Sequence, residues 1–498
     1  MRHISMYDMM LHQWEYVDDC YKGVIAIKSR EKRETYLKKF PSEVNDTTKN
    51  SQYELRCWAA DYDNIFKSAI MSMVGIMGKI PAKVEFGSVD QVVKDLDMWG
   101  NKFDDRLIGL KARLNHAQTL FGRYGLWLDV ITDHKQQNPK FIIKEYTCYQ
   151  IVDGETYISP FDGKERLRWV KLDESKYVFN YQTKRREFRR RFRILALDGQ
   201  HRYYTAVLEG DGADGLWEAF DIVNPNTENI WYPIYRGTPL NFIPFTICNV
   251  DRLGIDEWQE PPFLDMAYST INAYNADSLY KQAMVNHATP TLVALNATMP
   301  DGMTLGGVIS VLSEEGGKGA DVRMLETNAG GLAELGRSAK SIKEEAMRRT
   351  IFGMLESVGA NTSGAAITLR TAAGTATVGS IDSAGARAIE EQLCFAAVWS
   401  GMTWDQAGES ISYTVDTSYM ASQGTVQSFV SLMGANLSMG TPFLSRQNLW
   451  SIVEKLHPGT LTDYETNELQ KEDEAGFPMP TMPLPNVEPT NAETAAPS

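Results

Sequence analysis

Residues 261–286 read PPFLDMAYSTINAYNADSLYKQAMVN, and residues 331–358 read GLAELGRSAKSIKEEAMRRTIFGMLESV. After Pro261-Pro262, which a first helical turn tolerates, the first stretch has no further Gly or Pro and predicts a helix of roughly 25 residues, about 38 Å long. The second stretch has an apolar seam at spacings of three and four residues, formed by Leu332, Leu335, Ala339, Ile342 and Ala346. We therefore expect two long helices to decide the fold.

The apolar residues of the first helix change face partway along, so we expect it to need neighbours on more than one side. Its two apolar sets are Leu264, Ala267, Ile271 and Tyr274, then Ala276, Leu279, Tyr280 and Ala283. On the second helix, Lys340 and Glu344 stand four residues apart, a favourable pair on a wet face. Between the helices, strand-like residues 291–295 and 308–312 and several glycines predict a compact hairpin module.

Residues 359–380 read GANTSGAAITLRTAAGTATVGS, a stretch of small residues in which Arg370 is the sole charge. So little bulk and charge predicts a mobile loop or linker. We then expect a helix over 383–399, a strand over 411–415 and two helices within 421–456. The acidic, Pro-rich tail from 471 is expected to be disordered.

The chain before residue 261 predicts further helices followed by strands. Residues 1–50 show no clean period and are expected to form an irregular arm, whereas 53–77 predicts one helix ended by Pro81. A helix over 103–120, closed by Gly122, should lead into a strand over 125–131. Residues 140–250 are rich in β-branched and aromatic residues, and turn pairs break them into hairpins at Asp153-Gly154, Asp162-Gly163, Asp198-Gly199 and Asp211-Gly212. The fold class is α+β.

Residues 184–193 read KRREFRRRFR, seven basic residues around two phenylalanines. Such a stretch could hold phosphate or an acidic partner. The alternative is an amphipathic or edge strand whose arginines face solvent and discourage edge pairing, and we weight it about two to one.

Composition limits the classes of function. A chain of 498 residues predicts about three folding units, or one large body with insertions. A net charge of −14 argues against tight sequence-independent binding of a polyanion. Five well-separated cysteines without a CxxC spacing favour neither a disulfide framework nor a zinc site. We find neither a membrane-spanning apolar stretch nor a signal peptide and expect no membrane partner.

No catalytic signature is found, so the prediction is that the protein is not an enzyme and needs no cofactor or metal. The glycine-rich 314–319 lacks the spacing of a phosphate-binding loop and is interpreted as a turn. The carboxylate pairs Asp61/Asp63 and Asp104-Asp105 could hold a cation, but beside helices they are more often caps or solvated residues.

The order of elements resembles that of portal proteins of tailed bacteriophages. The residues that carry the resemblance lie within about 50–420 and are Gly122-Arg-Tyr-Gly-Leu-Trp-Leu-Asp129, Asn241-Phe-Ile-Pro-Phe245, Pro261-Pro-Phe-Leu-Asp-Met-Ala267, Ile271-Asn-Ala-Tyr-Asn-Ala-Asp277 and Ala397-Val-Trp-Ser-Gly401. The resemblance implies a structural protein of the virion, assembled in the host bacterial cytoplasm and placed at one capsid vertex. Its ring, usually of twelve subunits, passes double-stranded DNA during packaging and ejection.

The resemblance also implies a division of the chain. An N-terminal arm and α+β wing would occupy 1–260, continued by a wing helix and strand at 381–420. The stem helices would be 261–286 and 331–358, the clip 287–330, the tunnel loop 359–380 and the helical crown 421–470, followed by the tail 471–498. Implied partners are further copies of the chain, the large terminase, major capsid and scaffolding proteins, and head-tail adaptor proteins.

Residues expected to line the DNA channel are Lys281, Arg348, Arg349, Thr368, Arg370 and Thr371. A ring of twelve such acidic chains would carry roughly −168, which repels DNA overall and leaves local basic rings to steer it. Two other classes of protein remain as alternatives: another head-tail structural protein, and a phage nucleic-acid enzyme with a helical insertion.

Overall fold

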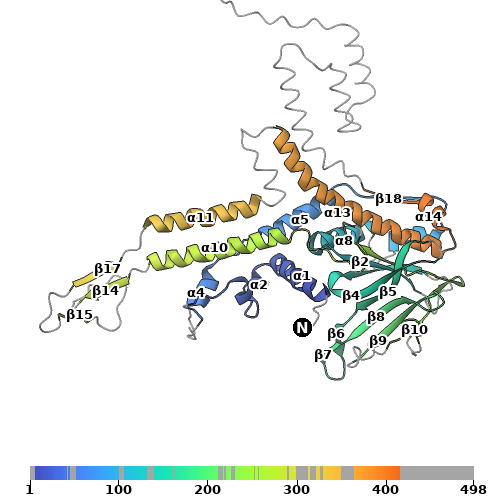
Figure 1. The fold of residues 1–498 in the computed structure, drawn as a ribbon, viewed down its shortest axis with the longest axis horizontal. Helices are drawn as coiled ribbons and strands as arrows, with labels where there is room; N and C mark the ends of the chain where they lie inside the picture. Colours follow the sequence, from blue (N-terminus) through green and yellow to red (C-terminus); the bar gives the residue numbers. More distant parts are fainter. Residues whose placement is uncertain are drawn as a thin grey trace, which may run out of the picture. The chain divides into compact units, whose positions relative to one another are not determined.

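Helices and β-sheets are mixed throughout the part of the chain that the computed structural model describes (Figure 1), which confirms the α+β class. The chain divides into two units, Met1–Met420 and Ala421–Ser498, and every described residue belongs to the first. The described residues are 6–41, 43–44, 52–99, 106–131, 140–160, 163–210, 217, 220–225, 230–251, 253–255, 257–288, 291–295, 297–298, 312–313, 321–325, 329–348 and 364–415. The helices expected within 421–470 and the tail from 471 lie outside this range.

Several short helices open the chain: α1 (Met6–Lys22), α2 (Val24–Ile27), α3 (Arg33–Tyr36), α4 (Gln52–Ala59) and α5 (Ile65–Met77). The expected irregular arm over 1–50 is therefore wrong for its described residues. Met10, Trp14, Val17 and Cys20 lie three or four residues apart and are all buried. This apolar stripe lies between polar residues, which hid its helical period.

The single helix expected over 53–77 is instead the pair α4 and α5, separated by residues 60–64. The break is set by Asn64, whose side chain accepts a hydrogen bond from the backbone N–H of Lys67 at 2.9 Å and caps α5. Asn favours such a cap because its short side chain satisfies a free N–H of the first helical turn. The linker between the helices carries the two carboxylates Asp61 and Asp63.

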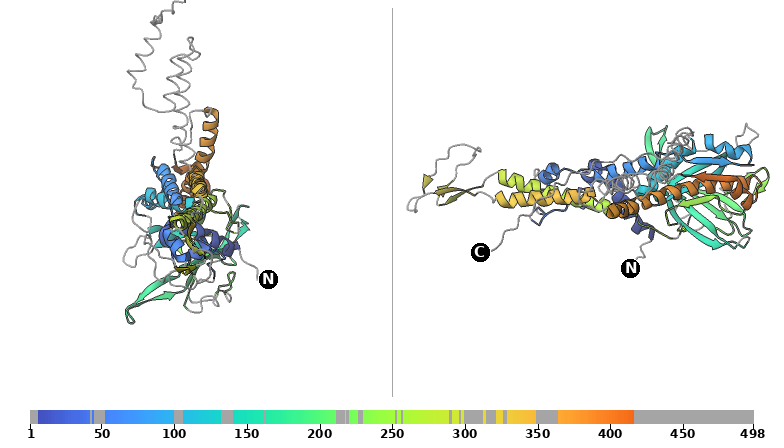
Figure 2. Two further views of the ribbon diagram at one scale, coloured as in Figure 1. Left: turned by 90° about the vertical axis from the view of Figure 1, so that its left-hand side faces the viewer. Right: turned by 90° about the horizontal axis from the view of Figure 1, so that it is seen from above.

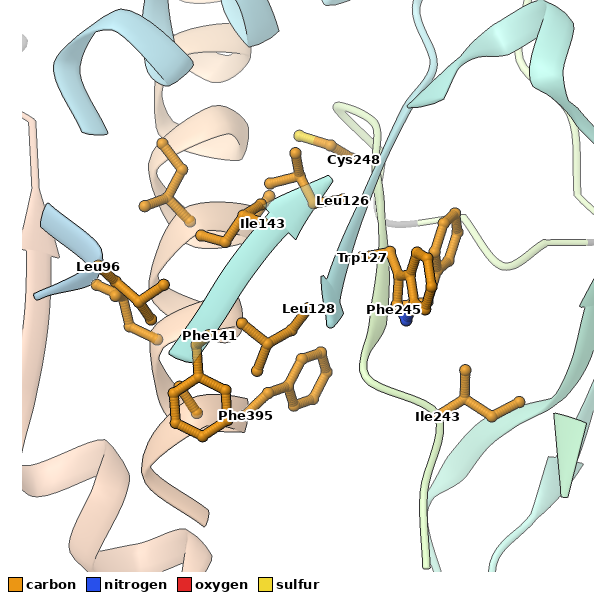
Figure 3. Packing of buried hydrophobic residues seen from close by; sticks show 14 of the residues in the cluster. Leu96, Leu126, Trp127, Leu128, Phe141, Ile143, Ile243, Phe245, Cys248 and Phe395 are labelled. Atoms are coloured by element: carbon orange, nitrogen blue, oxygen red, sulfur yellow. The ribbon is translucent and has the colours of Figure 1, made fainter. Parts of the chain in front are cut away.

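The core of the body lies between a three-stranded sheet and two helices. The sheet has the order β13-β2-β3 and is antiparallel, and its strands are β2 (Tyr124–Ile131), β3 (Lys140–Thr147) and β13 (Phe245–Cys248). Side chains of β2 and β3, among them Leu128 and Phe141, meet Phe395 of α13 (Gly364–Trp399) in a dry layer (Figure 3). On α8 (Leu107–Phe121), Gly122 ends the helix at φ 77°, as expected from the sequence.

Buried polar contacts tie α13 to its neighbours in this body. Asp382 is 1% exposed and receives hydrogen bonds from Lys111 Nζ at 2.7 Å and Asn115 Nδ2 at 2.6 Å, both on α8. Gln392 Nε2 donates to the Leu126 carbonyl at 3.2 Å and to Thr246 Oγ1 at 2.9 Å. Because a buried polar group is costly unless it is paired, these contacts fix one position of α13 on the sheet.

A second, five-stranded antiparallel sheet has the order β10-β9-β8-β5-β4. Its strands are β4 (Ile151–Ile158), β5 (Glu165–Asp173), β8 (Arg191–Leu197), β9 (Tyr203–Glu209) and β10 (Ile230–Trp231). The hairpin β6 (Lys176–Asn180) and β7 (Arg185–Arg189) is inserted between β5 and β8 and extends beyond the sheet (Figures 1 and 2).

The turn pairs that we expected in this region have different outcomes. Asp198-Gly199 is a turn between β8 and β9, where Asp198 accepts hydrogen bonds from the backbone N–H of Gln200 and Arg202, each at 2.9 Å. The turn expected at Asp153-Gly154 is wrong, because both residues lie inside β4. Gly154 is needed there for space, since a Cβ atom would lie 2.3 Å from Ile255 Cδ1. Gly163 lies in a turn at φ 66°, whereas Asp162 and Asp211-Gly212 lie outside the described residues.

The small-residue stretch 359–380 is helical wherever it is described. Helix α13 begins at Gly364 and continues without a break into the expected helix 383–399, so the loop prediction is wrong from 364 onward. Residues 359–363 lie outside the described part. Alanine is the best helix former, and five alanines between 364 and 377 account for a helix that lacks bulky side chains.

The remaining described elements are short. They are β1 (Lys83–Phe86), which pairs with β18 (Ile411–Thr414), and α6 (Gln91–Lys94), α7 (Leu96–Trp99), η1 (Cys148–Gln150), β11 (Ile234–Tyr235), β12 (Thr238–Pro239) and α14 (Trp404–Ser410). None of the described helices is both long and apolar enough to cross a membrane. The five cysteines are free thiols, four of them buried, and burial raises the pKa of Cys20 to about 12.

Candidate functional site: the α10–α11 helix pair

Two long helices, α10 (Leu264–Ala288) and α11 (Ala329–Arg348), lie side by side and are joined through a β module (Figures 1 and 2). The module pairs β14 (Thr291–Leu295) with β17 (Asp321–Leu325), and β15 (Ala297–Thr298) with β16 (Leu312–Ser313). These findings confirm the expected first helix, the start of the second and the strand at 291–295. Residues 308–311, 314–320 and 349–358 lie outside the described part.

The two helices are in close contact at Gly336 of α11. A Cβ atom at this position would lie 2.9 Å from Cε2 of Tyr280, so the tyrosine ring of α10 occupies the space that a side chain would need. Ala339 lines the same contact on the next turn of α11. Small residues on α11 thus let the helices pack closely around one aromatic ring.

Exposure changes sharply along α10. Its first half, with Leu264, Ala267, Ile271 and Tyr274, is buried in the body, where each side chain is at most 6% exposed. Its second half carries Leu279 at 46% and Met284 at 43% exposure. The first apolar set is therefore buried, whereas Leu279 of the second set is left about half exposed by the residues that the structure describes.

Helix α11 shows the same incomplete coverage. Ala346 of its apolar seam is buried, whereas Leu335 and Ile342 are 45% and 38% exposed. Leu335 and Ile342 are seven residues apart and share one flank of the helix. We call these two residues, with the exposed Leu279 and Met284 of α10, the open apolar flank of the pair.

Two lysines join the helix pair to the linker between α4 and α5. Lys281 of α10 forms an ion pair with Asp61 and a second one, at 3.4 Å, with Asp277. Lys343 of α11 forms an ion pair with Asp63. The backbone N–H of Asp61 also donates to Asp277 Oδ2 at 2.8 Å. We call Asp61, Asp63, Asp277, Lys281 and Lys343 the acidic anchor.

The acidic and basic groups of the anchor stabilise one another in their charged forms. The hydrogen bond from Lys281 lowers the pKa of Asp61 below its ordinary value. Desolvation alone would lower the pKa of Lys281, but the Asp61 and Asp277 carboxylates raise it above its ordinary value. Since the Asp61 side chain is 74% exposed, water and salt screen this pair, and it positions the helices more than it stabilises them.

A cavity of about 230 Å³ lies beside the anchor, lined in part by Thr270, Tyr274, Tyr280 and Lys340. A larger one, about 330 Å³, opens in the body next to Arg166, Phe242 and Glu391. Crowding by neighbouring protein desolvates Glu391 and raises its pKa, although the side chain still reaches solvent through the cavity and accepts a 2.8 Å hydrogen bond from Thr246. Within the described residues, no cluster of three or more His, Cys, Asp or Glu side chains could hold a metal ion.

The residues that we expected to line a channel lie on three helices. Lys281 is on α10, but the anchor engages it, so it is not a free cation. Arg348 is the last residue of α11, and Arg349 lies outside the described part. Thr368, Arg370 and Thr371 lie in the first turns of α13. The structure describes no contact that brings these six residues together.

Sequence reasoning recognised Asp61 and Asp63 but did not identify their partners. Both side chains are solvent-exposed, as expected beside helices, and each also forms an ion pair with a lysine that lies more than 200 residues later in the chain. The expected pair Lys340–Glu344 is present at 3.8 Å. No local pattern could have found the anchor, since it exists only after α10 and α11 pack on the body. Asp104-Asp105 lies outside the described residues.

Comparisons of the chain with protein-family models and with curated protein sequences return no match. The function proposed for this chain therefore rests on its fold and on the α10–α11 helix pair.

Proposed function

We propose that the chain is the ring-forming portal subunit of a tailed bacteriophage, a structural protein through which double-stranded DNA is packaged and later ejected. The observation that carries the proposal is the helix pair: α10 and α11 bracket a β module, and their open apolar flank contains Leu279, Met284, Leu335 and Ile342. Helices that bury one side in a body and leave another side apolar suit a ring in which each subunit packs between two neighbours.

In this proposal α10 and α11 are the stem, and the β module between them is the clip that meets the terminase motor and later the adaptor proteins. The α+β body is the wing. Twelve copies with a charge of −14 each repel DNA as a whole, which suits a conduit that DNA must slide through. Because Lys281 is engaged by Asp61 and Asp277, the steering of DNA in this proposal depends on Arg348, Arg349 and the start of α13.

The direct test is the assembly state of the purified full-length chain. Mass photometry should give a single large species, and negative-stain microscopy should give rings with a central channel, with twelve subunits the expected number. A chain that stays monomeric at micromolar concentration, or assembles without a channel, would contradict the proposal. Nuclease or nucleotidyltransferase activity that a single carboxylate substitution abolishes would favour the enzyme alternative.

A second test concerns Arg370. In phage assembly, Arg370→Ala should lower the amount of DNA packaged or retained while rings still form, because it removes the sole charge between Glu356 and Asp382. Thr377→Ala on the same helix is the matched control. Normal packaging by the Arg370 variant would remove this residue from the channel, but the ring itself would be unaffected.

A further inference from the structure

The β6–β7 hairpin concentrates positive charge in an acidic chain. Residues 176–190 contain six basic residues and one acidic residue, Glu187, a local charge of +5 where the whole chain carries −14. The six basic residues are Lys176, Lys184, Arg185, Arg186, Arg189 and Arg190. The hairpin forms its own two-stranded sheet, so solvent reaches both of its faces.

Five of these cations have no ion pair with any residue that the structure describes: Lys176, Lys184, Arg185, Arg186 and Arg189. The arginines that follow on β8 behave differently, since Arg191 and Arg193 bind Glu174 at 3.0 and 2.7 Å. The one carboxylate of the hairpin, Glu187, has hydrogen-bond partners within the hairpin. Asn180 Nδ2 and Thr183 Oγ1 both donate to Glu187 Oε1, each at 2.9 Å.

The pairing register separates the side chains of the hairpin into two faces. Opposite residues of an antiparallel pair share a face, and successive residues alternate. Pairing of Lys176 with Arg189, of Val178 with Glu187 and of Asn180 with Arg185 therefore gives a basic face with three cations, Lys176, Arg185 and Arg189, and one carboxylate, Glu187. Pairing of Tyr177 with Phe188 places these aromatic rings on the other face.

The rings of the aromatic face contact one another and stabilise the hairpin, although Tyr177 and Phe188 remain 67% and 53% exposed. The ring centroids of Tyr177 and Phe188 lie 5.2 Å apart at 59°, and those of Phe179 and Tyr181 lie 5.2 Å apart at 81°. Tilted and edge-to-face pairs of this kind hold a two-stranded ribbon together. Because these rings are inclined to one another, they do not form one flat platform on which successive unpaired bases would stack.

From this geometry we infer that the basic face of the β6–β7 hairpin binds the phosphate backbone of double-stranded nucleic acid without sequence preference. A strand rises about 3.3 Å per residue, so Arg185 and Arg189, four residues apart on one face, present two separate cations about 13 Å from each other. The arginine fork makes two parallel hydrogen bonds to a phosphate, and a repeating backbone satisfies several such cations together. The earlier alternative, solvent-facing arginines that guard a sheet edge, accounts for exposure but predicts no ligand. The inference does not depend on ring assembly.

The test measures binding of the full-length chain to a short fluorescein-labelled DNA duplex by anisotropy over a series of salt concentrations. The variant Lys176→Gln/Arg185→Gln/Arg189→Gln should bind at least roughly tenfold more weakly at low salt. The slope of log affinity against log salt should become shallower by about 2.7, since each lost phosphate contact contributes about 0.9.

The matched control is Lys22→Gln/Lys83→Gln/Arg106→Gln, which removes the same net charge from exposed residues outside the hairpin. It should leave the affinity within about twofold and the slope unchanged. Circular dichroism of all three proteins checks that the fold is retained. Because each Gln variant keeps the strand register and the aromatic pairs, loss of binding by unfolding of the hairpin is not expected.

Three outcomes would overturn the inference. The hairpin variant could bind duplex as tightly as the unaltered chain, the unaltered chain could prefer a single strand of the same length, or the hairpin variant could change only self-association. The second outcome would point to base stacking and the third to contact between copies. Failure to form rings leaves this inference standing, and failure to bind duplex leaves the proposed ring standing, so the two failures are distinguishable.

Discussion

The body and the α10–α11 helix pair differ in how completely their apolar side chains are buried and how far their ion pairs are shielded from solvent. In the body, Trp127 and Trp399 are fully buried or nearly so, and Asp382 has two polar partners from α8. In the pair, Leu335 and Ile342 are substantially exposed, and the ion pairs of the anchor are open to solvent. The described core of the body is packed within one chain, whereas the described part of the pair leaves apolar side chains exposed that a second molecule could cover.

The largest effect on folding is expected from Asp382→Ala in the body. Lys111 would remain buried without its counter-charge, which costs about 3–5 kcal/mol. Urea denaturation of the variant and the unaltered chain measures the difference. Asp18→Ala, which removes an exposed i,i+4 partner of Lys22, is the control and should cost less than about 0.5 kcal/mol. Similar costs for the two variants would show that burial does not distinguish these ion pairs.

A smaller effect is expected for Glu174→Gln, at the edge of the body. Desolvation would raise the pKa of Glu174, but hydrogen bonds and charge from Arg193, with Tyr146, lower it. The folded protein therefore gains stability from this carboxylate above its ordinary pKa and loses it as pH falls through the lowered pKa. The variant should lose about 1–3 kcal/mol at pH 7.

Thermal unfolding at several pH values tests this prediction. The difference between Glu174→Gln and the unaltered chain should shrink at pH values below the ordinary carboxylate range. A difference that stays constant into strong acid would mean that shape, and not charge, holds Arg191 and Arg193 in place.

Glu391→Gln should change the free energy of unfolding in the opposite direction to Glu174→Gln, and by a smaller amount. Desolvation raises the pKa of Glu391, so the folded chain keeps its proton to higher pH than the unfolded chain does. Stability from this group is complete below the ordinary pKa and falls as pH rises through the raised pKa. At pH 7 glutamine should gain a few tenths of a kcal/mol, because solvent in the cavity screens the charge.

Melting temperatures at pH 7 and pH 4 check the sign for Glu391. The gain should be present at pH 7 and absent at pH 4, with Glu390→Gln, its chain neighbour, tested in parallel. A loss of stability at pH 7 would mean that Glu391 is favourable as a carboxylate, contrary to the direction of its pKa.

The smallest effect on folding of one chain, and the largest on assembly, is expected for Leu335→Glu/Ile342→Glu. Both side chains are already exposed, so the free energy of unfolding should change by less than about 0.5 kcal/mol. Assembly should fail because two charges would enter the proposed contact with the neighbouring copy. Mass photometry would then give monomers.

The matched control on α11 is Ala333→Glu/Ser341→Glu, which adds the same two charges at exposed positions of the same helix that do not neighbour Leu335 and Ile342 at helical spacing. It should still assemble. Assembly by the Leu335/Ile342 variant would mean that the open apolar flank is not a contact between copies and would remove the main support for the ring.

The difference between local contacts and contacts between distant parts of the chain explains which features could be predicted from the sequence. Helix α10, the turn at Asp198-Gly199 and the cap at Gly122 were predictable, because each depends on residues close together in the chain. The N-terminal helix α1 was missed because its buried stripe, with Trp14, matters only once a body covers it. The start of α13 was mistaken for a loop because alanine supplies helix propensity without an apolar period.

The candidate site was predictable in outline but not in its contacts. The two helices and the module between them could be predicted from local sequence patterns. The ion pair between Asp63 and Lys343 could not, because these residues are 280 positions apart in the sequence. Lys281 was expected to face DNA, and its engagement by Asp61 depends on where α10 leaves the body. Periodicity identifies which face of a helix is apolar, but it does not identify which molecule covers that face.

Helix α10 also has a mechanical consequence. Its first half is buried in the body and its second half leads to the β module, yet no Gly or Pro interrupts the helix. An unbroken helix of 25 residues acts as a stiff lever. A tilt of about 5° at the buried end displaces the far end by about 3 Å over a length of about 38 Å. A small repacking around Tyr274 can thereby become a displacement at β14 large enough for a docked molecule to sense.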